Sequence, residues 1–168
     1  EVLHKKWGDK IHLDVYSSFN IYGWPQRDEQ YKEVFDKCRE HPGIEYHGSV
    51  PNEEIREALK KAHIFAYPSI WQETSCIAAI EAMSAKCAVV CPNFAALPET
   101  VANFGLTYQY DEDPTQHANK HLQLLDAAIA DYWNERHVDK LNFQKIYVDN
   151  FYSWDHRIVE WENLLRSL

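Results

Sequence analysis

Clustered basic residues, long apolar runs and paired cysteines are all missing from this chain of 168 residues. The formal net charge is -9, whereas nucleic-acid binding depends on clustered Lys and Arg, so we expect no nucleic-acid partner. No apolar run approaches the ~20 residues that cross a bilayer. We therefore expect a cytoplasmic protein, and peripheral contact of the full-length protein with a membrane is left open.

The four cysteines form no C-x-x-C pair, which argues against a zinc ribbon or a dithiol redox site. Cys76, Cys87 and Cys91 lie in apolar runs, where a free thiol behaves as a small hydrophobic side chain. A chain of this length buries roughly 70% of its unfolded surface, enough for a core without disulfides or metal. The cysteines thus favour a reducing compartment.

Segments with the apolar pattern of a strand alternate with segments that have the apolar periodicity of a helix along the first two thirds of the chain. Strands are expected at residues 11–16, 43–48, 64–67 and 87–91, and helices at residues 26–40, 51–62 and 73–85. This alternation predicts right-handed βαβ crossovers, and hence an α/β fold with a doubly wound parallel sheet. From Pro114 only helical patterns follow, so residues 114–168 are expected to form a helical tail of a single domain, residues 1–168.

Glu81 stands inside a run of small and apolar residues. Its neighbours on the same helix face are Ile77, Ala78, Ser84 and Ala85, none of which can pair with a carboxylate charge. Glu81 could therefore be a solvated glutamate on an exposed helix edge, or a carboxylate held beside a polar ligand. The residues alone leave both readings open.

A second carboxylate, Glu73, would begin the same predicted helix, about 12 Å of helical rise from Glu81. That separation disfavours the paired carboxylates of a glycoside hydrolase, which stand about 5 to 9.5 Å apart. The helix N-terminus at "ETSC" would receive phosphate, and it follows a strand whose carboxyl end is a usual ligand position. A ligand with phosphate groups at the helix N-terminus and hydroxyl groups at each of the two carboxylates would be a nucleotide-diphosphate sugar.

The segment "PSIWQETSCIAAIEAM" resembles the E-x7-E segment of retaining, nucleotide-sugar-dependent glycosyltransferases of the GT-B fold, above all family 4, also called group 1. "YHGSVPNEEIREALKKAHIFAYPS" and "CAVVCPNFAALPETV" resemble the segments on either side of it. The resemblance covers residues 1–112. It implies the Rossmann-like, C-terminal donor-binding domain of such an enzyme, N-terminally truncated and lacking the N-terminal acceptor domain. The first residues, "EVLHKKW", have the pattern of the later turns of a helix with no N-cap before it, so we expect the chain to be a fragment of a longer protein.

The resemblance also implies roles for individual residues. Glu73 would be the catalytic residue, contacting the hydroxyls of the donor sugar and supporting charge development at its reacting end. Glu81 would accept hydrogen bonds from the ribose hydroxyls. The remaining donor-binding positions lie directly after Glu73, where backbone amides face the sugar and diphosphate, and in a turn that meets the nucleobase: Thr74, Ser75, Cys76 and Ile77; Gly48, Ser49 and Val50.

Family members of this type use no metal or other cofactor, and we expect none in the reaction. The expected partners are a UDP or GDP sugar as donor, the missing acceptor domain, and a glycan or lipid-linked acceptor. The isolated domain should be inactive alone. Two rivals stay open: a sugar-nucleotide epimerase of the GT-B fold, and a noncatalytic module that uses the same fold for binding or interaction.

The chain departs from the family pattern at several places. The family usually has Gly at Cys76, so the approach of the backbone to the donor differs slightly here. It also has Gly at Lys86, just past the helix end, where a left-handed backbone costs a non-Gly residue about 1 kcal/mol. The basic residues that normally neutralise the diphosphate are not found, and Lys5 and Lys6 are more often solvated surface charges.

A histidine pair and a set of aromatic residues lie in the helical tail. His117 and His121 have i, i+4 spacing but lack the glutamate of H-E-x-x-H, so we predict no metal there. The tail aromatics, Trp133, Trp154 and Trp161 among them, should pack between helices, with an exposed docking surface as the alternative.

Overall fold

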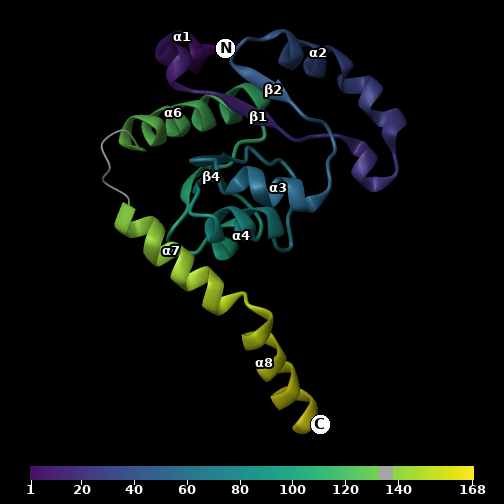
Figure 1. Cartoon of the computed structure of the whole chain (residues 1–168), viewed down its shortest axis with the longest axis vertical. Coiled ribbons are helices and arrows are strands. Elements are labelled where there is room, and N and C mark those ends of the chain that lie inside the picture. The colour runs from purple at the N-terminus through teal and green to yellow at the C-terminus, as the bar shows by residue number, and fades with distance from the viewer. Residues whose placement is uncertain (133–137) are drawn as a thin grey trace. The chain divides into compact units, whose positions relative to one another are not determined.

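A computed structural model describes residues 1–132 and 138–168 (Figure 1). The described chain divides into two compact units, Glu1–Glu57 and Ala58–Leu168, and each is considered by itself. Trp133, which the sequence placed in helix packing, lies outside the described residues. None of the described helices has the length and apolar character needed to cross a membrane.

The first unit contains a parallel pair of short strands with helical segments around it. The pairing register places Leu13 opposite Ile44, Asp14 opposite Glu45 and Val15 opposite Tyr46. Its elements are α1 (Val2–Trp7), the 3₁₀ helices η1 (Gly8–Lys10), η2 (Phe19–Tyr22) and η3 (Pro25–Tyr31), β1 (Leu13–Val15), α2 (Lys32–Glu40), β2 (Ile44–Tyr46) and α3 (Asn52–Leu59), whose last residues enter the second unit.

Packing of α2 on β2 forms the core of the first unit. Phe35 is buried, and its ring stacks on Tyr46 at a centroid distance of 4.8 Å. The predicted helix at residues 26–40 is wrong in its first part, because η3 replaces its start. Asp28 of η3 accepts hydrogen bonds from the Ser18 hydroxyl at 2.5 Å and from the Phe19 amide at 2.8 Å. These contacts hold the segment to η2, and the α-helix begins only at residue 32.

The second unit contains a three-stranded parallel sheet in the order β3-β4-β5. Consecutive parallel strands require crossovers, and α4 supplies the crossover from β3 to β4. Its elements are β3 (Ile64–Ala66), α4 (Ile77–Ser84), β4 (Ala88–Asn93), α5 (Leu97–Thr100), β5 (Leu106–Gln109), α6 (Pro114–Tyr132), α7 (Val138–Phe151) and α8 (Trp154–Arg166).

Strand β4 is the centre of this core. Val89, Val90 and Cys91 are fully buried, as expected of a continuous apolar strand covered on both faces. All four cysteines are free, and the three in apolar runs are buried, as predicted. Burial raises the pKa of Cys87 to about 11 and that of Cys91 to about 12, so both thiols remain uncharged at neutral pH.

The predicted α/β class is confirmed: parallel strands alternate with helices that flank them. Two features differ from the expectation. The strands form two separate parallel sheets, of two and three strands, and the third strand of the second sheet, β5, was not predicted. The predicted strands are shorter than expected, except that β4 extends to Asn93.

Helix α7 lies beside α4 (Figure 1), and its side chains donate hydrogen bonds to carbonyl oxygens at the C-terminal end of α4. Gln144 of α7 is fully buried, and its amide nitrogen donates to the carbonyl oxygens of Met83 at 3.1 Å and Cys87 at 2.9 Å. Lys145 donates to the Ser84 carbonyl oxygen at 2.9 Å. The last carbonyls of a helix have no partner within it, so these donors fix where α4 ends.

Lys86 has the left-handed conformation expected from the sequence, with φ 66°. We expect Lys86→Gly to raise the free energy of unfolding by about 0.5–1 kcal/mol, because relief of the left-handed strain exceeds the entropy that glycine adds to the unfolded chain. Ala85 is the matched control, since its φ is -79°. Ala85→Gly should lower the same free energy, measured by urea unfolding. Stabilisation by both changes, or by neither, would contradict the assignment of strain to Lys86.

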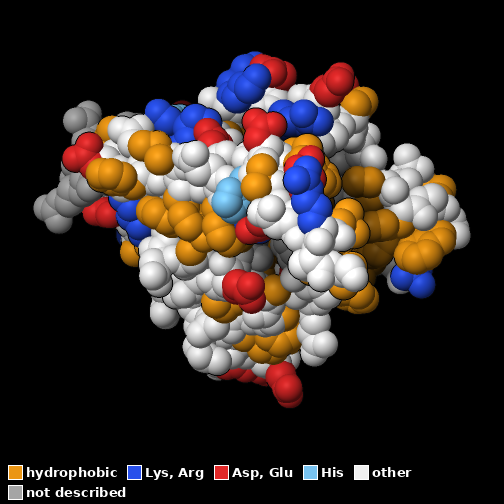
Figure 2. All heavy atoms as spheres, turned by 90° about the horizontal axis from the view of Figure 1, so that it is seen from below, with side chains coloured by type: hydrophobic (Ala, Val, Ile, Leu, Met, Phe, Trp, Pro, Cys, Tyr) orange, Lys and Arg blue, Asp and Glu red, His pale blue; other side chains and the backbone are white. Residues whose placement is uncertain are grey.

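The tail helix α8 exposes its aromatic residues. Trp154 is 77% exposed and Trp161 is 59% exposed, so the prediction that they pack between helices is wrong. The neighbouring Ser153 caps the helix by accepting a hydrogen bond from the His156 amide. On the face shown in Figure 2, Lys and Arg side chains lie among Asp and Glu side chains, in agreement with the absence of a basic cluster in the sequence.

Candidate functional site

Two loops meet at the carboxyl edge of the three-stranded sheet. The first joins β3 to α4, and the second follows β4. The Ala96 amide of the second loop donates to the carbonyl oxygen of Glu73 in the first, at 3.1 Å. Glu73 is therefore placed at the edge where open α/β sheets bind their ligands.

The Glu73 side chain is partly buried and held by a tyrosine. The Tyr67 hydroxyl donates to Glu73 Oε1 at 2.6 Å, and the Tyr67 ring stacks on Phe65 of β3. Burial, followed by this hydrogen bond, raises the pKa of Tyr67, so the hydroxyl stays a neutral donor at physiological pH. The contact orients a carboxylate at the sheet edge without neutralising its charge.

Helix α4 begins later than the sequence indicated. Cys76 is the N-cap, with extended backbone (φ -101°, ψ 93°), and the first helical residue is Ile77. The expectation that Glu73 opens this helix is therefore wrong. The Glu73 amide donates to the Trp71 carbonyl oxygen at 3.0 Å, and its carbonyl oxygen is taken by Ala96. Both groups are used by loop contacts, and the 12 Å helical separation between the two glutamates no longer applies.

The amino end of α4 retains the features that suit an anion. In the part of the chain that the structure describes, no side-chain hydrogen bond caps it, and Thr74 and Ser75 directly before it are exposed. Ile77 is 68% exposed. Cys76 is buried, and burial raises the pKa of its thiol, so no negative charge arises there. Uncapped N-terminal amides and the positive end of the helix dipole favour a phosphate at this position.

Glu81 lies in the second turn of α4, five residues after the N-cap, which corresponds to about 7.5 Å along the helix axis. It is partly buried, between the fully buried Ala79 and Ala82 of the core-facing side and the exposed Ile77. Glu81 is therefore neither fully exposed nor fully buried. Its predicted contact with ribose hydroxyls stays a prediction.

The predicted nucleobase segment, Gly48, Ser49 and Val50, belongs to the first unit and follows β2. Gly48 has φ +70°, a left-handed conformation that favours glycine. The chain therefore turns sharply at this point, with Ser49 exposed. The assignment of these residues to a nucleobase stays a prediction.

A buried aromatic cluster supports the first loop from α6. The His117 Nε2 lies 3.0 Å from the Tyr108 hydroxyl and 3.4 Å from the Pro68 carbonyl oxygen. Tyr110 meets His117 edge-on and stacks on Phe94 at 3.9 Å. His117 thus supports the base of the first loop, and the absence of a metal at His117 and His121 stays a prediction.

Burial lowers the pKa of His121 to about 4, and the charge of His117 acts in the same direction. A folded pKa below the unfolded value of about 6.5 means that the unfolded state binds the proton first, so stability falls as pH falls through this window. We expect the free energy of unfolding to drop by about 2 kcal/mol between about pH 7 and about pH 5 through this group.

The His121→Leu variant should lose most of that drop in urea unfolding at the two pH values. His156 is the matched control, because its side chain is 51% exposed on α8. His156→Leu should keep the full drop. An unchanged pH dependence in His121→Leu would show that His121 is not the titrating group.

Sequence reasoning missed the roles of Tyr67 and the Ala96 amide at the site, and the contacts of His117. Tyr67 was the easiest of these to predict from the sequence, because it directly follows β3 and polar residues at strand ends often contact ligands. Ala96 contributes a backbone amide, which no residue type reveals. His117 was identified by its spacing, but its partners come from β5 and the first loop.

The fold has a solved counterpart. The crystal structure of TarM matches with a TM-score of 0.58 and 20% sequence identity, over 97% of this chain and 30% of that chain. At this identity the likeness shows the fold alone.

Two curated relatives share more of the sequence. An uncharacterized 41.2 kDa protein in the cps region of Klebsiella pneumoniae is 28% identical over 121 residues, covering 71% of this chain and 30% of the relative. The O-antigen chain mannosyltransferase B of Escherichia coli is 30% identical over 113 residues, covering 67% of this chain and 28% of the relative. The chain thus spans less than a third of the length of these relatives. A family model described as "Glycosyl transferases group 1" matches residues 1–127, well over half of the chain, and the chain therefore belongs to the group 1 glycosyl transferases.

Proposed function

We propose that this chain is the donor-binding part of a glycosyltransferase that transfers a sugar from a nucleotide-diphosphate sugar with retention of configuration. Membership of the group 1 family and the name of the Escherichia coli mannosyltransferase support sugar transfer. The observation that carries the proposal is the Glu73 carboxylate. It is held by Tyr67 at the carboxyl edge of the sheet, a few residues before the uncapped N-terminus of α4.

In this proposal the diphosphate lies at the amino end of α4. The bond from the anomeric carbon to the diphosphate breaks, a bond from that carbon to the acceptor hydroxyl oxygen forms, and the hydroxyl proton passes to the departing diphosphate. Negative charge grows on the departing diphosphate, and backbone N–H groups of Thr74, Ser75, Cys76 and Ile77 stabilise it. Donors that are already oriented need no reorganisation during the reaction, which is why such groups accelerate it.

The two glutamates bind opposite ends of the donor. Glu73 accepts hydrogen bonds from the sugar hydroxyls, and its charge stabilises the positive charge that develops at the anomeric carbon. Glu81 accepts hydrogen bonds from the ribose hydroxyls. No metal takes part in the transfer. The acceptor is a glycan or a lipid-linked glycan.

Calorimetric titration of the chain with UDP, GDP and their sugars tests the donor site. One of the two nucleotide series should bind, and its 2′,3′-dideoxy analogue should bind about 10–100-fold more weakly, because Glu81 loses charged hydrogen bonds. Glu81→Gln should reduce this discrimination, and Glu162→Gln on α8, where the side chain is 59% exposed, should not. Equal affinity for nucleotide and dideoxy analogue in the unmodified chain would refute the role of Glu81.

A further inference from the structure

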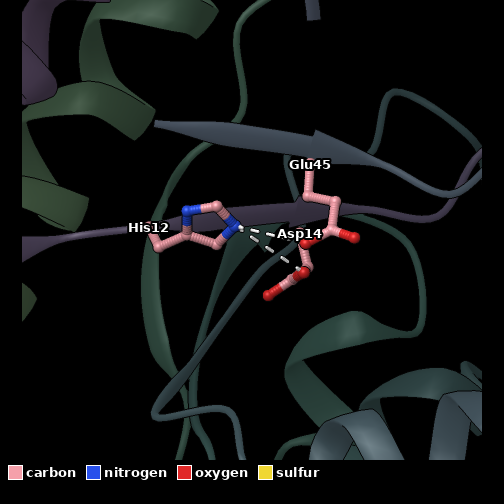
Figure 3. Close-up of side chains that lie close together, drawn as sticks. All are labelled: His12, Asp14 and Glu45. Atoms are coloured by element: carbon pink, nitrogen blue, oxygen red, sulfur yellow. Dashed lines mark ion pairs between the residues drawn. The ribbon is translucent and has the colours of Figure 1, made fainter. Parts of the chain in front are cut away.

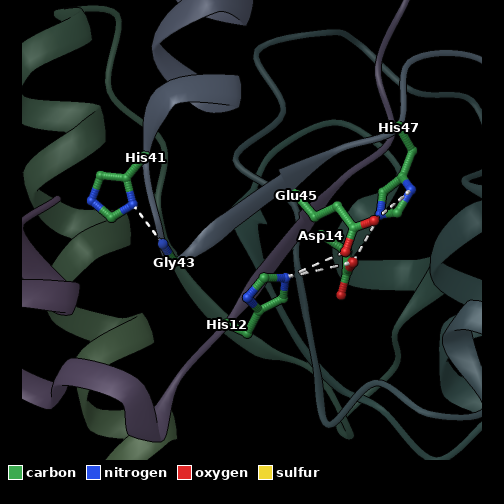
Figure 4. A network of polar contacts seen from close by, with 6 residues as sticks. All are labelled: His12, Asp14, His41, Gly43, Glu45 and His47. Carbon is green, nitrogen blue, oxygen red and sulfur yellow. Dashed lines mark hydrogen bonds and ion pairs between the residues drawn. The ribbon is translucent and has the colours of Figure 1, made fainter.

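Four polar side chains gather on one face of the two-stranded sheet β1–β2 (Figure 4). His12 and Asp14 come from the first strand segment, and Glu45 and His47 come from the second. Residues two apart along a strand point to the same face, and the register places Asp14 directly opposite Glu45. The pairing of the two strands thus brings these four residues together from distant parts of the sequence.

Three of the four offer ligand atoms to a common point (Figure 3). One nitrogen of His12 and one carboxylate oxygen each of Asp14 and Glu45 lie within 4.8 Å of one another. The His12 Nε2 is 3.9 Å from an oxygen of each carboxylate. Ligand atoms about 2.0–2.2 Å from a tetrahedral zinc ion are about 3.3–3.6 Å apart. The two His12 distances would have to shorten by a few tenths of an ångström, and separations of up to 4.8 Å by about 1.2–1.5 Å, which rotations of the three exposed side chains can supply.

His47 occupies the position of a supporting residue. Its Nε2 lies 2.8 Å from Asp14 Oδ1, and its ring stacks on Tyr16 at 4.3 Å with an interplanar angle of 6°. Hydrogen bonds from outside the ligand set commonly orient the carboxylates that bind a metal. The stacked His47 ring fixes Asp14 in this way before any ion arrives.

The charges of the cluster also favour a cation. Two carboxylates directly opposite each other on paired strands repel, which destabilises the sheet. A divalent ion between Asp14 and Glu45 replaces that repulsion with attraction to both strands. Because the ligand side chains are exposed, little desolvation opposes the binding of an ion from solvent.

We propose that His12, Asp14 and Glu45 bind one zinc ion, with water as the fourth ligand and His47 as the residue that orients Asp14. A histidine nitrogen combined with carboxylate oxygens suits Zn²⁺, whereas Ca²⁺ and Mg²⁺ take oxygen ligands. The ion joins β1 to β2 and is structural. It is separate from the sugar transfer proposed above, which uses none of these residues and no metal.

The test is calorimetric titration of the EDTA-treated chain with Zn²⁺ at neutral pH. One site per chain is expected. His47→Phe should weaken Zn²⁺ binding about 10–100-fold, as loss of a supporting residue does. His12→Ala and Glu45→Gln remove ligands and should weaken binding by more than His47→Phe.

His156→Ala is the matched control, because His156 on α8 has an exposed glutamate partner, Glu160, at 3.3 Å but belongs to no group of three ligand residues among the described residues. It should leave Zn²⁺ affinity unchanged. Circular dichroism of each variant checks that it is folded, and visible absorption of Co²⁺ bound in place of zinc reports the coordination geometry. No binding by the unmodified chain, or equal binding by folded Glu45→Gln, would overturn the proposal.

Discussion

Replacing Glu73 with glutamine in the full-length protein lowers kcat for sugar transfer by about 10²–10⁴-fold, the range expected when a charged group that acts at the reacting centre is lost. Glutamine keeps the size of the side chain, and its carbonyl oxygen can still accept the hydrogen bond from the Tyr67 hydroxyl. The change therefore removes the charge and leaves the local structure in place.

Two further variants separate the charge from its positioning. Tyr67→Phe removes the hydroxyl that donates to Glu73 but keeps the carboxylate, so kcat should fall by a smaller factor than in Glu73→Gln. Glu162→Gln on the exposed face of α8 should leave kcat unchanged. If Glu73→Gln raised only KM, Glu73 would bind the donor without assisting the reaction. Unchanged transfer would show that Glu73 does not act at the reacting centre, and no transfer by the unmodified full-length protein would favour the noncatalytic module that the sequence left open.

The second large effect concerns stability. Gln144→Ala should lower the free energy of unfolding by about 3–5 kcal/mol, because two buried carbonyl oxygens lose a donor, one of them keeping the Lys86 amide, and a cavity remains. Those oxygens belong to Met83 and Cys87, at the end of α4 and the residues after it. Urea unfolding followed by circular dichroism measures the change.

Gln144→Leu separates the two causes, since it fills the space without restoring the donor. The loss should be smaller, about 2–3 kcal/mol. Gln123→Ala on the exposed side of α6 is the control and should change stability by no more than about 0.5 kcal/mol. If both Gln144 variants matched this control, α7 would not hold α4 in place, and the position of its amino end at the site would need another explanation.

Local patterns were enough to predict most of the second unit. The apolar run "CAVVC" indicated a strand buried on both faces, and β4 is such a strand. The small apolar residues Ala79, Ala82 and Met83 indicated a buried helix, which α4 confirms. The left-handed conformation of Lys86 also followed from its place just after that helix. In these segments, hydrophobic periodicity and helix-end rules act on neighbouring residues.

The structure differs from the sequence-based prediction where contacts between residues distant in the sequence determine the local structure. The start of α4 moved from residue 73 to Ile77 because an amide 23 positions later, at Ala96, takes the Glu73 carbonyl oxygen. The strand β5 has four residues, and only its pairing with β4 distinguishes it from a loop. The cluster of His12, Asp14 and Glu45 depends on strand register, which no local pattern specifies.

Amide chemical shifts of the ¹⁵N-labelled chain during titration with UDP, GDP and their sugars test the central claim most directly. The account predicts that the largest shifts fall in residues 73–81, around the amino end of α4, and that Glu73→Gln weakens the response to the sugar nucleotide more than to the nucleotide alone. An absence of shifts in residues 73–81 at millimolar ligand would contradict the donor site.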